Sequence, residues 1–372
     1  MSNSTDHGAS HRPAPGPHRD TFAKMKEQGM KTNPGRFFED YRMGETILHA
    51  VPRTVSGGER ALYHALYPAR GALHSSDEFA RTCGLPASPI DDLLAFHLVF
   101  GKTVPDISLN AVANLGYAEG RWHVPVYSGD TLRAESEVIG LKQNSNGKSG
   151  VVWVRTRGFN QRNEVVLDYV RWVMVRKHDM TAAAPETQLP ELAGSVASGD
   201  LIIPEGLDFT GYDFTLAGEP HRWGDYEIGE KIDHVDGVTV EEAEHMLATR
   251  AWQNTAKVHF DATFRGDGKR LIYGGHVISL ARALSFNGLA NAQLVVALNG
   301  GAHANPCFSG DTVKAWSEVL DKAETGAPGV GAIRLRLVAV RQGAEAFALH
   351  NEKGGYADDV LLDLDYWALM PV

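Results

Sequence analysis

Apolar positions recur with a helical period in four stretches of the chain. GGHVISLARALSFNG, from Gly274, is apolar nearly all round, and IDDLLAFHLVFG, from Ile90, is similarly apolar, so both predict buried helices. TVSGGERALYHALY, from Thr54, and TVEEAEHMLATRAW, from Thr239, predict helices that begin at a Thr or Ser cap. In the latter, Glu242 follows Thr239 by three residues, which predicts a capping box.

Other stretches have the two-residue period of β-strands. LRAESEVIGL, from Leu132, and VVWVRTRGF, from Val151, alternate apolar and polar residues, which is typical of half-buried strands. VVLDYVRWVMV, from Val165, and VLLDLDYWALM, from Val360, are longer and rich in β-branched and aromatic residues. These last two predict strands in the middle of a sheet.

The phrase SGDT occurs twice, in YSGDTLRAESEV from Tyr127 and in FSGDTVKAWSEV from Phe308. Each copy lies between strand-like runs, so Gly-Asp predicts a turn and Thr the start of a strand. A motif repeated in the same context indicates that the chain contains two copies of one fold.

The repeat extends over whole domains. Asp40-Tyr41 matches Asp225-Tyr226 at a spacing of 185 residues, and the same spacing pairs His74 with His259. The spacing shifts to 181 at SGDT and to 195 near the end of each copy, as loop insertions would produce. We therefore predict a disordered tail (1–33), a first copy (34–177), a linker (178–211) and a second copy (212–372).

Composition excludes several classes of protein. The 372 residues have a formal net charge of −10, which argues against nucleic acid as the main partner but allows a small anionic ligand. No apolar run approaches the ~20 residues that cross a membrane, and the N-terminus lacks a secretory apolar core. We expect a cytoplasmic protein. Its two cysteines, Cys83 and Cys307, have no metal-site spacing and predict idle buried thiols.

A sheet wrapped around one long buried helix is the hotdog architecture, and here the order of elements is written twice. The sequence resembles the MaoC-like dehydratase and (R)-specific enoyl-CoA hydratase family from Asn33 onward, as an α+β tandem (double) hotdog. NPGRFFEDYRMGETI, TVSGGERALYHALYPARGALHSSDEFA and the doubled SGDT resemble one branch, the mesaconyl-CoA hydratases, also called β-methylmalyl-CoA dehydratases.

The resemblance implies a hydro-lyase that adds water reversibly to a branched, carboxylated enoyl-CoA, without a metal or redox cofactor. Such chemistry needs a base for water, an acid for the α-carbon and a donor for the thioester oxygen. The family supplies the first two from a D-x-N-P-x-H loop. Here the loops read NTAKVH, Asn254 to His259, and ARGALH, Ala69 to His74, so both keep the histidine and both lack the aspartate.

Either histidine is therefore a candidate catalytic residue. We favour His259 because Asn254 could orient the water, while His74 remains a serious alternative. A second acid would have to come from elsewhere, and the candidates are Asp261, Asp77, Asp91 and Asp92. For Asp92, a plain acidic residue in the first turn of a helix is the simpler interpretation.

Substrate-binding candidates follow from the same resemblance. Gly274 and Gly275 could leave backbone N–H groups open to the thioester oxygen. The free carboxylate of a mesaconyl group requires an arginine, for which Arg250 and Arg282 are candidates beside Arg70 and Arg60. Lys257 is a candidate for the CoA phosphates.

Two further functions and one assembly are kept open. A hotdog thioesterase would aim a carboxylate such as Asp92 at the thioester carbonyl, and a non-catalytic acyl-CoA binder would need neither histidine. A monomer is possible because a double hotdog already pairs its two sheets within one chain, but further pairing into a homodimer is common enough to expect.

Overall fold

The computed structural model describes residue 29 and residues 31–372, and its strands form one antiparallel sheet of ten strands. The order is β1-β3-β4-β5-β2-β7-β10-β9-β8-β6. The first half of the sheet consists of β1 (Thr46–Thr54), β2 (Ala111–Trp122), β3 (Thr131–Gln143), β4 (Ser149–Phe159) and β5 (Val165–Arg176). The second consists of β6 (Lys231–Thr239), β7 (Leu294–Ala302), β8 (Thr312–Glu324), β9 (Val330–Arg341) and β10 (Val360–Pro371).

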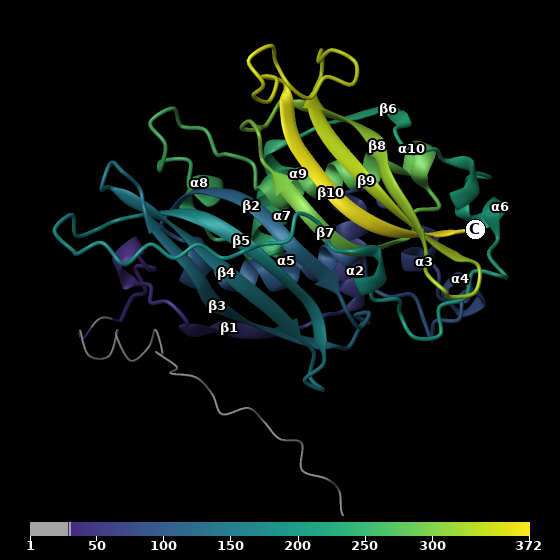
Figure 1. Ribbon diagram of the computed structural model, residues 1–372, viewed down its shortest axis with the longest axis horizontal. Helices are drawn as coiled ribbons and strands as arrows, with labels where there is room; N and C mark the ends of the chain where they lie inside the picture. Colours follow the sequence, from purple (N-terminus) through teal and green to yellow (C-terminus); the bar gives the residue numbers. More distant parts are fainter. Residues whose placement is uncertain (1–28, 30) are drawn as a thin grey trace, which may run out of the picture.

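The two halves have the same strand order, read outward from a shared seam. β2 pairs with β7 at this seam, where Tyr117 lies opposite Gly301, and Figure 1 shows the teal first half continuing into the yellow-green second half. β5 and β10, predicted to be central strands, are each flanked by strands on both sides. The pairing of β2 with β7 joins the copies into one sheet.

One buried helix crosses the inner face of each half. They are α5 (Asp92–Thr103) and α9 (Gly274–Leu284), as the apolar stretches predict, and the largest buried cluster includes Leu94 of α5 and Leu280 of α9. The remaining helices are α2 (Gly57–Leu66), α3 (Ala72–Ser75), α4 (Asp77–Thr82), α6 (Phe214–Ala217), α7 (Glu242–Ala251), α8 (Lys257–Phe260) and α10 (Phe286–Leu289). Short 3-10 segments lie at η1 (Phe38–Asp40), η3 (Ser198–Asp200) and η4 (Trp223–Asp225), and α5 runs into a π-helical turn, η2 (Val104–Ser108).

The predicted capping box at Thr239 is wrong. Thr239 ends β6, and its hydroxyl bonds that of Thr312 across the sheet at 2.8 Å, so it is not available to a helix. Helix α7 begins three residues later with Glu241 as its N-cap. A capping box by a hydroxyl occurs instead in the first copy, where Ser56 caps Gly58 at 3.1 Å and the Ser56 N–H donates to the Glu59 carboxylate at 2.8 Å.

The two SGDT phrases form the same turn. The Tyr127 N–H donates to the Asp130 carboxylate at 2.9 Å, and the Phe308 N–H donates to Asp311 in the same way at 2.9 Å. The glycine of each phrase has a positive φ, 103° at Gly129 and 93° at Gly310, which a side chain would disfavour. The phrase is thus a turn into a long strand, as predicted.

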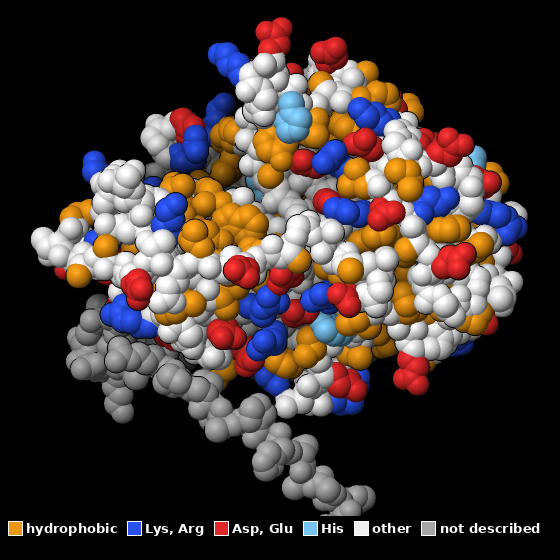
Figure 2. All heavy atoms as spheres, viewed as in Figure 1, with side chains coloured by type: hydrophobic (Ala, Val, Ile, Leu, Met, Phe, Trp, Pro, Cys, Tyr) orange, Lys and Arg blue, Asp and Glu red, His pale blue; other side chains and the backbone are white. Residues whose placement is uncertain are grey.

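The remaining predictions concern the connecting segments and the surface. Residues 1–33 lie almost wholly outside the described residues, and segment 178–211 buries Val196, Leu207 and Phe209 in a core cluster. Both cysteines are buried and free. Within the described chain, no helix is long and apolar enough to span a membrane. Figure 2 shows acidic and basic side chains interspersed over one face, without a continuous basic surface.

Candidate active site

Two cavities lie at equivalent places in the two copies, each beside the loop histidine of one copy. The cavity beside His259 has a volume of about 290 Å³, and the cavity beside His74 has about 40 Å³. Residues of both copies line each one: Tyr117 of the first copy reaches the His259 cavity, and Gln293 of the second reaches the His74 cavity. Neither site is complete in a single copy.

His74 is held as a cation by its surroundings. Its Nδ1 lies 3.3 Å from the Pro89 carbonyl and its Nε2 lies 3.1 Å from the Gln293 carbonyl, so both nitrogens face groups that only accept. In addition, Asp92 Oδ2 lies 3.5 Å from His74 Nε2. Burial by itself lowers the pKa of His74, but the hydrogen bond and charge of Asp92 outweigh it and raise the pKa to about 9.

Asp92 owes its position to the start of the central helix α5. Asp91 is the N-cap and accepts from the Leu93 N–H at 2.9 Å, which places Asp92 as the first helical residue. The Asp92 carboxylate accepts from the Val295 N–H at 2.8 Å while pairing with His74. The pocket beside His74 therefore contains an ion pair between His74 and Asp92, and this histidine is not a free base.

His259 has the opposite chemistry at the matching position. Its Nδ1 donates to the Leu271 carbonyl at 2.8 Å, which leaves the proton on Nδ1 and the lone pair on Nε2. Burial, offset by this hydrogen bond, lowers the pKa of His259 to about 4. A neutral imidazole whose Nε2 is unprotonated is suited to take a proton from water at neutral pH.

Asn254 is buried and lines the cavity of His259. Its side-chain Oδ1 accepts from the Ala256 N–H at 3.4 Å, and its own N–H donates to the Thr249 carbonyl at 3.0 Å. The loop thus holds the backbone of Asn254 through its N–H and the side-chain amide through Oδ1. The first copy has Ala69 in the matching position, without a polar group.

Gly274, the first residue of α9, makes room for a second histidine. A Cβ at this position would lie 2.6 Å from Nε2 and 2.8 Å from Nδ1 of His303, so only glycine lets this ring pack against the helix start. Tyr117 is within hydrogen-bond distance of His303 Nε2, at 3.3 Å. Burial is the main cause that lowers the pKa of His303 to about 4, and the nearby His259 is the second cause. The imidazole rings of His259 and His303 are therefore both neutral at pH 7.

The structure separates the other residues predicted from the sequence. Arg282 lines the small cavity beside His74 and Asp92, with Nη1 donating to Ser285 Oγ at 2.9 Å. Gly275 packs against Tyr273 and His97 and does not line the large cavity. Asp261, Lys257 and Arg250 are exposed and outside both cavities.

Sequence reasoning missed most of the polar residues that line the large cavity, among them Asn114, Tyr117, Arg171 and His303. A signal existed for one of them. Pro125 and Pro306 align at the 181-residue spacing of SGDT, and at the same spacing His303 aligns with Trp122 in the sequence. A histidine in one copy where the other has a tryptophan points to a position that changed its role.

The fold and site together define the class: a MaoC-like double hotdog with a neutral histidine in a cavity between its halves. A protein of Mycobacterium tuberculosis described as a double hotdog fold superposes with a TM-score of 0.70 at 24% identity, covering 90% of this chain and 98% of that one. A MaoC domain dehydratase of Chloroflexus aurantiacus superposes with a TM-score of 0.90 at 57% identity, covering 92% and 99%.

Sequence comparison gives the family. The profile described as "Mesaconyl-CoA hydratase" matches residues 17–349. The mesaconyl-CoA hydratase of Cereibacter sphaeroides is 80% identical over 342 residues, which is 92% of this chain and 100% of that protein. The β-methylmalyl-CoA dehydratase of C. aurantiacus is 57% identical over 346 residues, 92% and 98%. The chain belongs to the mesaconyl-CoA hydratase family.

Proposed function

We propose that this protein is a hydro-lyase that adds water reversibly across the double bond of mesaconyl-CoA to give β-methylmalyl-CoA. Family membership supports the reaction. The observation that carries the site is the neutral His259 beside a cavity of about 290 Å³. A cavity of about 150 Å³ holds a molecule the size of benzene, so this one accommodates a five-carbon acyl group and part of the pantetheine arm.

In the proposed reaction, His259 Nε2 takes a proton from water as the water oxygen attacks the β-carbon, which bears the free carboxylate. Negative charge then develops on the thioester oxygen. The N–H of Gly274, the first residue of α9, has no carbonyl partner within the helix and lies at its positive end beside the cavity, so it is suited to hold that oxygen.

The imidazolium of His259 can return its proton to the α-carbon, so that one H and one OH are added and the base is regenerated. Asn254 would hold the attacking water through its amide. A separate carboxylic acid is then not required, and the exposed Asp261 would have no catalytic part. We propose that His74 and Asp92 stabilise the fold, because their cavity of about 40 Å³ holds waters but not the acyl group.

Purified protein incubated with mesaconyl-CoA tests this proposal. We expect the enoyl-thioester absorbance to fall without release of free thiol, and the reverse change when β-methylmalyl-CoA is supplied. Free thiol would indicate a thioesterase. Binding without either change would indicate a non-catalytic acyl-CoA protein.

Three further expectations accompany the proposal. The reaction as written needs no metal or redox group, so activity should survive exhaustive dialysis against a chelator. The homodimer stays a prediction that the mass in solution checks. A location in the cytoplasm also stays a prediction, which fractionation of cells checks.

A further inference from the structure

Arg171 is a buried cation in the wall of the His259 cavity. It lies on β5, inside an apolar strand, and its side chain is 0% exposed. The same cavity is lined by His259 and Gly274, the proposed base and the proposed binding site of the thioester oxygen. None of the four arginines considered from the sequence reaches this cavity.

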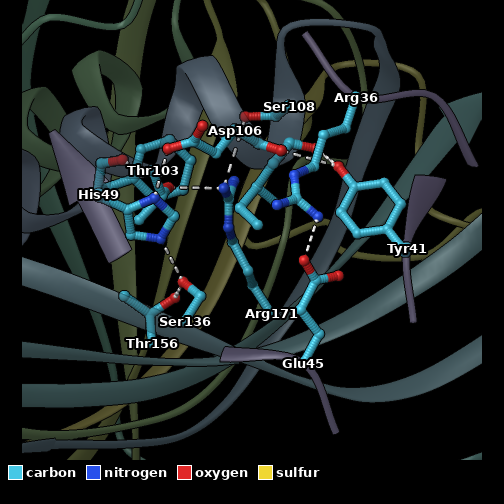
Figure 3. Close-up of polar contacts among 12 residues, drawn as sticks. Arg36, Tyr41, Glu45, His49, Thr103, Asp106, Ser108, Ser136, Thr156 and Arg171 are labelled. Atoms are coloured by element: carbon cyan, nitrogen blue, oxygen red, sulfur yellow. Dashed lines mark hydrogen bonds and ion pairs between the residues drawn. The ribbon is translucent and has the colours of Figure 1, made fainter. Parts of the chain in front are cut away.

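Only one of the three guanidinium nitrogens of Arg171 forms hydrogen bonds with described residues. Nη2 donates to Thr103 Oγ1 at 2.7 Å and to Ser108 Oγ at 3.5 Å, contacts drawn in Figure 3 at the end of α5 and in η2. Nη1 and Nε are buried and have no hydrogen-bond partner among the described residues. The guanidinium also lies over the ring of Phe100, 4.3 Å from its centroid, which fixes its plane.

No carboxylate neutralises this charge in the described part of the chain. Ion pairs are found nearby, but Arg36 pairs with Glu45 at 2.8 Å, and Asp106 bonds His49 Nδ1 at 2.9 Å (Figure 3). No ion pair within 4.0 Å joins a described acidic residue to Arg171. Arginine stays charged even when buried, and a buried charge without a partner costs several kcal/mol, so a ligand anion is the expected partner.

Asn114 is a second unsatisfied polar group in the same wall. Both atoms of its amide are buried without a hydrogen-bond partner among the described residues. It lies on β2, the strand paired with β5, three residues before Tyr117, which is directly opposite Arg171 in the register. The wall of the cavity therefore holds a cation with two unbonded donor nitrogens and, on the adjacent strand, an amide without a hydrogen-bond partner among the described residues.

We propose that Arg171, assisted by the Asn114 amide, binds the free carboxylate of the acyl group and so selects dicarboxylic acyl-CoA substrates. This rests on the proposed function. The CoA phosphates are another source of anions, but Arg171 lies inside the molecule beside the proposed reacting groups, where the acyl end of the substrate belongs. Arginine suits a carboxylate because its planar fork matches the two oxygens.

Binding of unreactive ligands tests this inference independently of turnover. Methylsuccinyl-CoA carries the carboxylate, 2-methylbutyryl-CoA has a methyl group in its place, and free CoA reports on the phosphates alone. In titration calorimetry, we expect the wild type to bind methylsuccinyl-CoA at least 30-fold more tightly than 2-methylbutyryl-CoA. Arg171→Met should reduce this preference to about threefold or less, with the affinity for free CoA unchanged.

The outcomes separate the inference from the hydratase proposal. A wild type without preference, or an Arg171→Met variant that keeps it, overturns the inference even if mesaconyl-CoA is hydrated. A parallel loss of affinity for free CoA assigns Arg171 to the phosphates and also overturns it. A preference that Arg171→Met abolishes supports the carboxylate site even if no hydration is found.

Turnover and further variants sharpen the test. For a protein that hydrates mesaconyl-CoA, Arg171→Met should lower kcat/KM at least 100-fold with mesaconyl-CoA but little with tiglyl-CoA, which has a methyl group for the carboxylate. Arg155→Met, which removes an ion-paired arginine on β4 outside the cavity, is the matched control and should leave the preference intact.

Stability distinguishes this role from a structural one. Replacing an unpaired buried cation by an apolar side chain should leave the melting temperature unchanged or raise it, whereas a structural arginine would lower it. Should Arg171→Met fail to fold, Asn114→Ala carries the test. It should reduce the preference for methylsuccinyl-CoA at least threefold, and an unchanged preference would count against the inference.

Discussion

The cavities beside His74 and His259 occupy the same place in two copies of one fold, yet they hold opposite charge states. His74 faces two carbonyl groups and Asp92, and these raise its pKa to about 9. His259 faces one carbonyl group and an open cavity, and burial lowers its pKa to about 4. A retained histidine is therefore not by itself a retained base.

The difference follows from few positions at the start of each central helix. Asp92 is the first residue of α5, and Gly274 is the first residue of α9. Trp122 donates its indole N–H to the Asp92 carbonyl at 2.9 Å, whereas its counterpart His303 packs against Gly274. A carboxylate and a tryptophan fill one copy, while a glycine and a histidine leave the other open.

The strongest test of this comparison replaces each histidine with glutamine. Because a positioned base contributes about 10²–10⁴-fold, His259→Gln should lower kcat with mesaconyl-CoA by roughly 10³, while His74→Gln should change it less than about threefold per folded molecule. The rate of loss of enoyl-thioester absorbance measures both, with circular dichroism giving the folded fraction. Equal losses, or a larger loss at His74, would reverse the assignment.

Asp92→Ala tests the structural role of the first copy. It removes the only carboxylate that pairs with the buried His74 among the described residues and leaves the Val295 N–H without its acceptor, so the free energy of unfolding should fall by about 3 kcal/mol. Urea denaturation measures the change, and the exposed Asp261→Ala is the control. An unchanged stability, combined with a large loss of kcat, would instead make Asp92 a catalytic acid.

Gly274→Ala tests the space that the second copy leaves open. The new Cβ would overlap the His303 ring, so the ring must move, and we expect kcat/KM to fall roughly tenfold to a hundredfold because small displacements of catalytic groups are costly. Gly57→Ala is matched, since Gly57 is also the first residue of a helix but has no atom within 4 Å of the added Cβ. Equal effects of the two substitutions would rule out the steric explanation.

The smallest effect is a difference in pH dependence. The pKa of His74 is raised from 6.5, so it stabilises the fold fully below pH 6.5 and this contribution is lost as pH rises through about 9. The pKa of His259 is lowered to about 4, so its contribution is present above pH 6.5 and is lost as pH falls toward 4.

Unfolding measured from pH 4.5 to 9.5 checks these signs. The stability advantage of the wild type over His74→Gln should shrink as pH rises from 6.5 to 9, by at most about 1.4 kcal/mol per pH unit. The wild type should lose stability relative to His259→Gln as pH falls below 6.5. Parallel curves for both variants would mean that the two histidines share one charge state.

Local patterns were sufficient for much of the fold. The 3.6-residue and two-residue periods predict α5, α9 and the strands β3, β4, β5 and β10, since burial of one face or all faces repeats with the backbone geometry. The doubled SGDT and the matched spacing predict the tandem hotdog. The cap at Thr239 failed because its hydroxyl is bonded across the sheet to Thr312, a partner 73 residues away.

The sequence by itself determined the repeated module, its order of elements and the family, because period, turn chemistry and identity are local or linear properties. Only the tertiary structure decided which histidine is neutral, since that depends on Asp92, Gln293 and Leu271 arriving from other segments. It also brought Arg171 and Asn114 into the wall of the cavity beside His259. Charge states and cavities depend on what surrounds a residue in space, and the linear order of residues does not specify that.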